Sequence, residues 1–253
     1  MCTTLSHNNI THFMRIAVIS DIHSNLPALE AVLAKARELN AERFYCLGDL
    51  VGYGPFPNEC IELVRSHCPV VIKGNHDSGL LGETPTDDFN SLGQQAIKWT
   101  KKQITPQNLD YLRRLPLLSV QNDVTLVHAS PAEPDQWTYV LTLRSAEECF
   151  GAFTTNLCFI GHTHVPVIIG DDMSINAYKP PSKNGPSSSR FLINVGSVGQ
   201  PRDGNPFAAF GIIDTETWNY ELIRVEYDIE KTATAITNAG LPIALAKRLF
   251  QGV

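Results

Sequence analysis

Short runs of Val, Ile, Leu and Phe, each long enough for one β-strand, recur along the 253-residue chain and most constrain its fold. In the first half they alternate with stretches of helical periodicity, of which Leu26–Leu39 is the clearest, with Asn25 as its expected N-cap. The second half is richer in strands. The pattern predicts an α/β architecture in which two mixed sheets pack face to face and helices cover the outside.

The expected elements are bounded by Gly, Pro, Asn or Asp. The strand-length runs are Ile16–Ser20, Phe44–Leu47, Val70–Lys73, Val124–Val127, Leu157–Ile160, Phe191–Val195, Ala208–Ile213 and Tyr220–Tyr227. Further helices are expected at Asn58–His67, Leu92–Gln103, Pro106–Leu115, Ala146–Phe153, Ile229–Ala239 and Pro242–Phe250. A chain of this length buries one full core, so residues 15–253 are expected to form a single domain.

Two segments are expected to lie outside the packed domain. Residues 1–14 have little charge and no apolar region of the secretory kind, so they predict a disordered lead, with Met14 as an alternative start. Tyr178–Arg190, rich in Pro and Ser, predicts a mobile hairpin tip. No run of about 18 apolar residues is present, and we expect a cytoplasmic protein without a membrane segment.

Composition excludes some function classes. The net charge of −6 and the lack of Lys/Arg clusters disfavour a stable nucleic-acid complex. The six cysteines form no CxxC pair, and we expect them to be reduced and structural. A monomer and a homodimer both remain open.

Potential metal ligands follow five of the expected strands directly. The segments are Ser20-Asp21-Ile22-His23, Gly48-Asp49, Gly74-Asn75-His76-Asp77, Val127-His128 and Gly161-His162-Thr163-His164. Five of the eight histidines fall in them. Because strand ends position functional loops in α/β folds, these side chains are expected to share one site.

Each segment alone also has an ordinary structural explanation. Asp-x-His after a strand is commonly a turn and cap, Gly74-Asn75 a left-handed turn, and His128 a core histidine. The pair His162 and His164 is harder to dismiss, since two imidazoles in an apolar context are costly to bury. Five such coincidences at five strand ends favour a metal centre.

The ordered set of motifs resembles the calcineurin-like metallophosphoesterase superfamily from about residue 15 to residue 228. Asp21-Ile22-His23-Ser24-Asn25 and Asn194-Val195-Gly196-Ser197-Val198-Gly199 are similar to its small prokaryotic branch of phosphodiesterases and diadenosine tetraphosphatase-related proteins. The resemblance implies a four-layer α-β-β-α sandwich, in agreement with the pattern above.

The resemblance also implies two divalent metal ions. Asp21, His23 and His164 would hold one, Asn75, His128 and His162 the other, and Asp49 would bridge them. Mixed imidazole and oxygen ligands suit manganese, our first choice, with iron, zinc or nickel as alternatives. A hydroxide shared by the metals would attack phosphorus in line.

By the same resemblance, His76 is the candidate general acid and Asp77 would orient its imidazole, although Asp77 is alternatively a cap of the next segment. Asn25 and Arg202 are candidate phosphate contacts. The larger protein-phosphatase members carry Gly-Asp-x-x-Asp-Arg-Gly, whereas Leu50-Val51-Gly52-Tyr53-Gly54 follows Asp49 here. This departure argues against protein phosphatase activity and against close kinship with the symmetrical diadenosine tetraphosphatase.

Two stretches are candidate walls of a substrate site: Ser78–Gln103, with Asp87-Asp88-Phe89-Asn90, and Ser130–Val140, with Trp137 and Tyr139. Trp99 is expected in the core. The sequence favours a metal-dependent phosphoesterase acting on small mono- or diesters, including nucleotide-like ones. A catalytically silent protein-binding scaffold is the main alternative, against which the intact His76 counts, and a mononuclear or structural metal protein is another.

Overall fold

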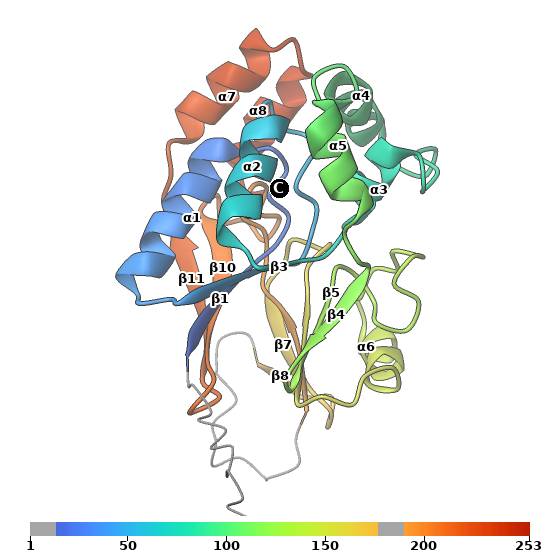
Figure 1. Cartoon of the computed structure of the whole chain (residues 1–253), viewed down its shortest axis with the longest axis vertical. Coiled ribbons are helices and arrows are strands. Elements are labelled where there is room, and N and C mark those ends of the chain that lie inside the picture. Colours follow the sequence, from blue (N-terminus) through green and yellow to red (C-terminus); the bar gives the residue numbers. More distant parts are fainter. Residues whose placement is uncertain (1–13, 177–189) are drawn as a thin grey trace, which may run out of the picture.

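Two mixed β-sheets form the centre of the protein (Figure 1). The structure, a computed structural model, describes residues 14–176 and 190–253. The strands of the first sheet, in spatial order, are β11 (Tyr220–Val225), β10 (Ala208–Asp214), β1 (Arg15–Ile19), β2 (Arg43–Cys46) and β3 (Val70–Val71). Those of the second are β4 (Leu118–Gln121), β5 (Val124–Val127), β6 (Leu157–Ile160), β9 (Phe191–Asn194), β7 (Val167–Gly170) and β8 (Ile175–Asn176).

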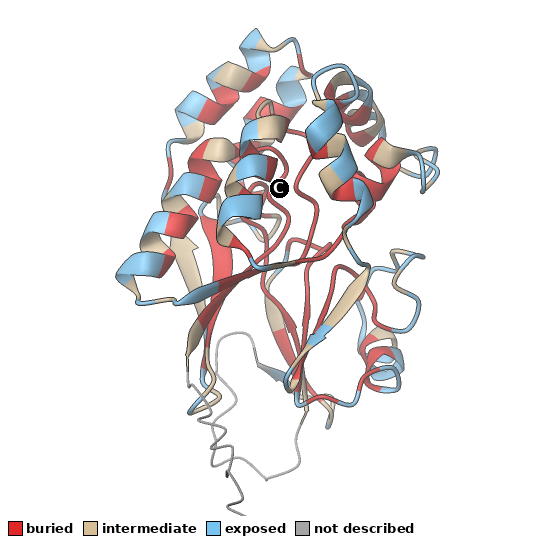
Figure 2. Cartoon of the chain, in the orientation of Figure 1, coloured by how far each residue is buried: buried red, intermediate tan, exposed pale blue. Residues whose placement is uncertain are grey.

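The alternation of side chains along β1 explains how the layers are held. Ala17 and Ile19 point to the helices, whereas Ile16 and Val18 belong to a core shared with Phe159 and other residues of the second sheet. Both faces of β1 are therefore buried, as its continuous apolar sequence predicts. Figure 2 shows the buried residues concentrated in the strands and on the inner sides of the helices.

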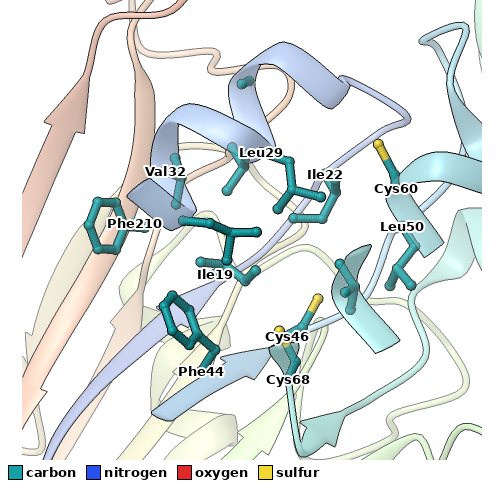
Figure 3. Close-up of a cluster of buried hydrophobic side chains, with 14 of the residues drawn as sticks. Ile19, Ile22, Leu29, Val32, Phe44, Cys46, Leu50, Cys60, Cys68 and Phe210 are labelled. Carbon is teal, nitrogen blue, oxygen red and sulfur yellow. The ribbon is translucent and has the colours of Figure 1, made fainter. Parts of the chain in front are cut away.

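Helices cover the outer faces of both sheets. α1 (Leu26–Glu38), α2 (Pro57–His67) and α7 (Ile229–Asn238) lie on the side of the first sheet, and α6 (Leu143–Phe150) packs on the second. In Figure 3, Leu29 and Val32 of α1 meet Ile19 and Phe210 of the first sheet. The expected α-β-β-α sandwich is confirmed.

A further group of helices lies near the strand ends: α3 (Asn75–Leu81), α4 (Ser91–Thr100), α5 (Pro106–Arg113) and α8 (Ile243–Leu249) (Figure 1). α3 was not expected, because it is short and its first turn consists of polar site residues. β4, β7 and β8 were missed as well. They are short strands, and β4 and β8 lie at the edges of the second sheet, where burial gives a weak pattern.

Several smaller expectations also have outcomes. Asn25 caps α1 as predicted, by accepting a hydrogen bond from the Ala28 amide. Met14 lies within the fold, where its amide donates to Thr215 Oγ1 at 2.9 Å. Most of the predicted lead and hairpin tip, residues 1–13 and 177–189, lies outside the described residues, as does Cys2; the other five cysteines are free and buried. No helix in the described ranges has both the length and the apolar character to cross a membrane.

Candidate metal centre

The five ligand-bearing segments converge at one edge of the sandwich. In the first sheet β1, β2 and β3 are parallel, and in the second β5 and β6 are parallel, so their carboxyl ends share an edge within each sheet. None of the side chains that gather there is more than 7% exposed: Asp21, His23, Asp49, Asn75, His76, His128, His162 and His164. The structure thus brings together all seven predicted ligands and the candidate acid.

Their donor atoms form overlapping groups. Within each group the potential ligand atoms lie within 4.8 Å of one another: Asp21, His23 and His164; Asp49, His128 and His162; and His23, Asp49 and His76. The first two match the predicted division into two sites. The third group was not predicted. It places a ring nitrogen of His76 within 4.8 Å of donor atoms of His23 and Asp49.

The histidine rings are fixed so that their Nε2 lone pairs meet. A backbone carbonyl can only accept, so each paired Nδ1 must carry the proton: His23 donates to Val51 at 3.0 Å, His128 to Leu47 at 2.8 Å and His164 to Gln200 at 2.5 Å. In the neutral rings Nε2 is then an acceptor. Yet His23 Nε2 lies 3.1 Å from His164 Nε2. Two facing acceptors at this distance call for a cation between them.

Asp49 lies between the two predicted sites. Its Oδ2 is 3.6 Å from His23 Nε2 and 3.4 Å from His128 Nε2, while its Oδ1 accepts from the His76 amide at 2.8 Å. Asn75 adds a neutral oxygen, with Oδ1 3.2 Å from His128 Nε2. This placement is the one required of a shared carboxylate.

The backbone at the ligands is unusual. Asp21, His23, Asp49, His162 and His164 all have left-handed conformations, with φ between 49° and 66°. Non-glycine residues seldom adopt this region, and such strain persists only where the surrounding structure imposes it. The concentration of strained residues at the ligands indicates a functional site rather than ordinary turns.

Two glycines beside the site residues are required for close packing. A Cβ at Gly161 would lie 2.0 Å from Ser20 Oγ and 2.5 Å from Asp21 Oδ2. At Gly52, where φ is 95°, a Cβ would lie 2.4 Å from His76 Nδ1. Side chains at either position would displace a site residue.

The segment from Asn194 to Gln200 braces the centre. Val198 and Gly199 amides donate to the carbonyls of Ser20 and Asp21, both at 2.9 Å. Asn194 Nδ2 donates to the Gly161 carbonyl at 2.6 Å. This glycine-containing turn therefore joins the two ligand loops, and its role here is structural.

The pKa shifts of most of these groups favour the protonation states that bind metal ions, which are the neutral imidazole and the ionised carboxylate. Burial lowers the pKa of His23 well below its usual value, and that of His162 to about 3. Burial opposes ionisation of Asp49, but the His128 and His76 imidazoles hold the pKa of Asp49 well below the usual range. His128 differs: despite burial, the Asp49 carboxylate raises the pKa of His128 to about 9. A cation would have to displace that proton.

The residues present fit divalent metal ions. Asp21 Oδ1 and His162 Nε2 are buried atoms with no hydrogen-bond partner among the described residues, and unsatisfied buried polar atoms are costly. Both face groups of donors that a metal would bind. Carboxylate, amide oxygen and imidazole together suit first-row divalent ions.

Asp77 does not make the predicted contact with the His76 imidazole. Its Oδ1 accepts from the amides of Leu50 and Val51, at 3.0 and 3.3 Å, and its Oδ2 from Gly74 at 3.0 Å. His76 Nδ1 has no hydrogen-bond partner in the described part of the chain. Asp77 is the third residue of α3, so its side chain turns back to cap the helix, as the alternative interpretation had it.

Asn25 is also committed to the fold. Its Nδ2 donates to the Gly199 carbonyl at 2.9 Å and to the Tyr227 hydroxyl at 3.2 Å, and its Oδ1 accepts from Ala28 and Thr232. The side chain is 1% exposed. Because its hydrogen-bonding groups are all engaged, the predicted phosphate contact is not supported.

Arg202 lies at the side of the centre. Its amide donates to the His164 carbonyl at 3.3 Å, and its guanidinium lies 5.8 Å from the Tyr53 ring centroid and donates to Gln200 Oε1 at 2.9 Å. Its Nε is buried without a partner in the described structure. The guanidinium thus retains a donor, and a phosphate contact stays a prediction.

Aromatic rings surround the ligands, and the sequence did not assign these contacts. Tyr139 stacks on His162 with ring centroids 3.9 Å apart, Phe89 lies 4.8 Å from His76, and Tyr53 lies 4.7 Å from His23. Tyr53 was not predicted to be a site residue, although its place between two glycines just after Asp49 marks a turn near a ligand; the structure buries this turn. Trp99, expected in the core, is partly buried and packs against a core cluster that includes residues of α7 and α8.

The two predicted wall stretches line one cleft beside the centre. Its volume is about 740 Å³, and its lining includes His76 and His162 as well as Phe89, Trp137 and Tyr139. Trp137 Nε1 donates to Thr84 Oγ1 at 2.9 Å, which joins the two loops across the cleft.

Comparison with known proteins agrees with this geometry. The chain is 42% identical over 241 residues to an uncharacterized protein of Methanocaldococcus jannaschii, covering 94% of this chain and 98% of that one. A metallophosphoesterase from Sphaerobacter thermophilus has a crystal structure with a TM-score of 0.85 and 43% identity, covering 95% of this chain and 99% of the other.

A symmetrical bis(5′-nucleosyl)-tetraphosphatase of Pectobacterium atrosepticum is 30% identical over 151 residues, or 53% of this chain and 49% of that protein. The match thus spans about half of each. Residues 14–166 match the calcineurin-like phosphoesterase family, and this span holds all seven predicted ligands. The chain therefore belongs to the calcineurin-like phosphoesterase family.

Proposed function

We propose that this protein hydrolyses small phosphate mono- or diesters at a centre of two divalent metal ions. Membership of the family supports a hydrolase of phosphoester bonds. The observation that carries the dinuclear proposal is the pair of facing acceptors, His23 Nε2 and His164 Nε2, beside a second group of donors that shares Asp49 with it.

Two sets of residues would hold the metals. Asp21, His23 and His164 would form one site and Asn75, His128 and His162 the other, with Asp49 common to both. When bound, the ions would supply Lewis acidity toward the phosphoryl oxygens and activate a water near neutral pH. Manganese is our first choice, because the centre mixes imidazole with hard oxygen ligands.

His76 would act on the leaving group. Its backbone amide is anchored to Asp49 Oδ1, its ring packs against Tyr53 and Phe89, and it lines the cleft. Burial lowers the pKa of His76 to about 4 in the free protein. A phosphate dianion beside the ring would favour the imidazolium and raise that pKa, so that His76 could give its proton to the departing oxygen. Arg202 would assist by holding a phosphate oxygen.

The test is hydrolysis of p-nitrophenyl phosphate and bis(p-nitrophenyl) phosphate by the manganese-loaded protein, together with its metal content. We expect two metal ions per chain and activity on at least one ester. Asp49→Asn should lose both metal and activity, because it removes the shared anionic ligand. The ester that is cleaved faster assigns monoesterase or diesterase.

A matched control is Asp110→Asn, which neutralises an exposed aspartate that pairs with Arg113 on the surface. It should retain metal and activity. A wild type that binds two metals but is no faster than Asp49→Asn on either ester would favour the protein-binding scaffold. A single metal per chain would favour the mononuclear alternative.

A further inference from the structure

The cleft beside the metal centre is larger than a phosphate group needs. At about 740 Å³ it falls within the range of sites that bind whole small molecules. His76 and His162 form part of its lining, so the space begins at the centre itself. It therefore accommodates the organic part of an ester whose phosphate lies on the ligands.

Aromatic side chains stand where that organic part would begin. Phe89 lies 4.8 Å from the His76 ring with an interplanar angle of 50°, and Tyr139 is stacked on His162 at 3.9 Å. Tyr139 is nevertheless 48% exposed, so much of the side chain remains open to the cleft it lines. Rings in these places can stack on a flat group attached to the phosphate.

Charges in the lining disfavour additional phosphates. Glu83, Asp88 and Asp135 are its carboxylates, and Lys73 is the one cation among the described lining residues. Lys73 is already engaged, since its Nζ lies 2.7 Å from Glu83 Oε2 and 3.4 Å from the Arg113 carbonyl. A second phosphate in the cleft would face Asp88 and Asp135 without a free counter-charge.

The position of His76 indicates which ester group enters the cleft. A general acid must lie within reach of the departing oxygen, and His76 lies between the ligands and Phe89. We infer that the cleft binds the leaving group of the substrate, and that this group is a flat, uncharged aromatic one, aryl or nucleoside, without further phosphate. The inference rests on the proposed function.

The reaction is a simple hydrolysis. The bond from phosphorus to the leaving oxygen breaks, a bond to a water oxygen forms, and a proton passes to the leaving oxygen. The products are the aromatic alcohol, which vacates the cleft, and the phosphate. Water is the only co-reactant.

The first experiment measures binding without turnover. Adenosine and 2-naphthol would be titrated into the metal-free protein and followed by saturation-transfer NMR. We expect binding of at least one, weakened about fivefold in Phe89→Leu, which keeps apolar packing but removes the ring. Phe207→Leu is the control, since Phe207 is exposed and outside the cleft lining. Absence of binding, or equal weakening by both variants, would overturn the inference.

The second experiment measures phosphate release by the manganese-loaded protein. We expect kcat/KM for adenosine 5′-monophosphate to exceed that for glycerol 3-phosphate, also a primary alkyl ester, about tenfold. It should also exceed that for adenosine 5′-diphosphate about tenfold, and the double variant Asp88→Asn/Asp135→Asn should narrow this second ratio. Phenyl phosphate, compared with the monophosphate, distinguishes an aryl from a nucleoside group.

The outcomes separate the two proposals. Hydrolysis of p-nitrophenyl phosphate with a preference for glycerol 3-phosphate or the diphosphate overturns the inference and leaves the proposed function standing. No hydrolysis of any ester overturns the proposed function, and with it the reaction assigned to the cleft. The same kinetic comparison is made with Phe89→Leu. If this variant leaves the ratio of kcat/KM for adenosine 5′-monophosphate to that for glycerol 3-phosphate unchanged, the proposed contact between Phe89 and the leaving group is overturned.

Discussion

The metal-ligand cradle and the walls of the adjoining cleft are built in different ways. The cradle, formed by the seven predicted metal ligands, consists of buried side chains, five of them on left-handed backbone, with three imidazoles fixed by backbone carbonyls. The walls come from two surface loops, where Asp88 and Tyr139 are exposed and the Trp137 side chain donates a hydrogen bond to Thr84 across the cleft. The cradle is suited to carry out the same reaction on every substrate. The walls are suited to select the substrate, because they can change without moving the ligands.

If this division is correct, changes in the cradle should alter metal content or turnover for every substrate. Changes in the walls should alter which ester is preferred. Substitutions of Gly52, Gly161 or Asp77 should also lower the stability of the fold. The two glycines allow site residues to pack closely, and the Asp77 carboxylate accepts hydrogen bonds from backbone amides beside the ligands. Variants of increasing distance from the ligands therefore test the comparison directly.

The largest effect is expected for His76→Gln, which tests whether His76 belongs to the chemistry or to the ligand set. Loss of a general acid costs about a hundredfold or more, and the loss should be larger for an alkyl phosphate than for p-nitrophenyl phosphate, whose leaving group needs little protonation. Metal content should stay at two ions per chain. Loss of a metal ion would instead make His76 a ligand, as its grouping with His23 and Asp49 allows.

Gly161→Ala should damage the cradle through packing alone. The new Cβ would lie 2.5 Å from Asp21 Oδ2, so that either the carboxylate or the loop must move. We expect a loss of about 2–3 kcal/mol in the free energy of unfolding, together with loss of one metal ion. Chemical denaturation and elemental analysis measure both.

Gly151→Ala is the matched control for this change. A Cβ there meets only the Glu148 carbonyl, at 3.4 Å, and the residue is exposed. It should bind metal like the wild type. Equal behaviour of the two variants would mean that Gly161 is not needed for close packing at Asp21.

Asp77→Asn should lower stability with little effect on metal content. Its carboxylate accepts three backbone amides that join the loop after β2 to the start of α3, and an amide group would present N–H to one of them. We expect a cost of about 2 kcal/mol, measured by denaturant titration. A large fall in kcat with unchanged stability would restore the catalytic role that the sequence suggested for Asp77.

The sequence was sufficient for the cradle because its residues follow strands directly. Strand ends are fixed by short-range pattern, and parallel pairing of β1, β2 and β3 brings their ends together whatever the loops do. The same reasoning found both sheets and the helices α1 and α7. All seven ligands are therefore placed as expected, although their metal-binding role stays a prediction.

The sequence did not predict the hydrogen-bond partners of polar side chains that can bond to several different groups. Asn25 and Asp77 each follow a predicted ligand by two residues, yet their hydrogen bonds go to Gly199, Tyr227 and the amides of neighbouring loops. Some of these partners are far away in the sequence; Tyr227 is 202 residues from Asn25. The stacking of Tyr139 on His162 depends likewise on tertiary contacts that no local pattern records.

The smallest effect is expected for Trp137→Phe, which removes the bond to Thr84 while keeping an aromatic ring in the wall. One hydrogen bond contributes about 1 kcal/mol, so global stability should fall by no more than that. Local opening should respond more: amide hydrogens of residues 82–90 and 131–142 should exchange faster, because the bond joins these loops. Trp99→Phe is the control, since its Nε1 donates to the Ala239 carbonyl within the helical core. If exchange at the ligand loops rises as much as in the walls, the cradle is not independent of the cleft, and the division between constant chemistry and variable substrate choice fails.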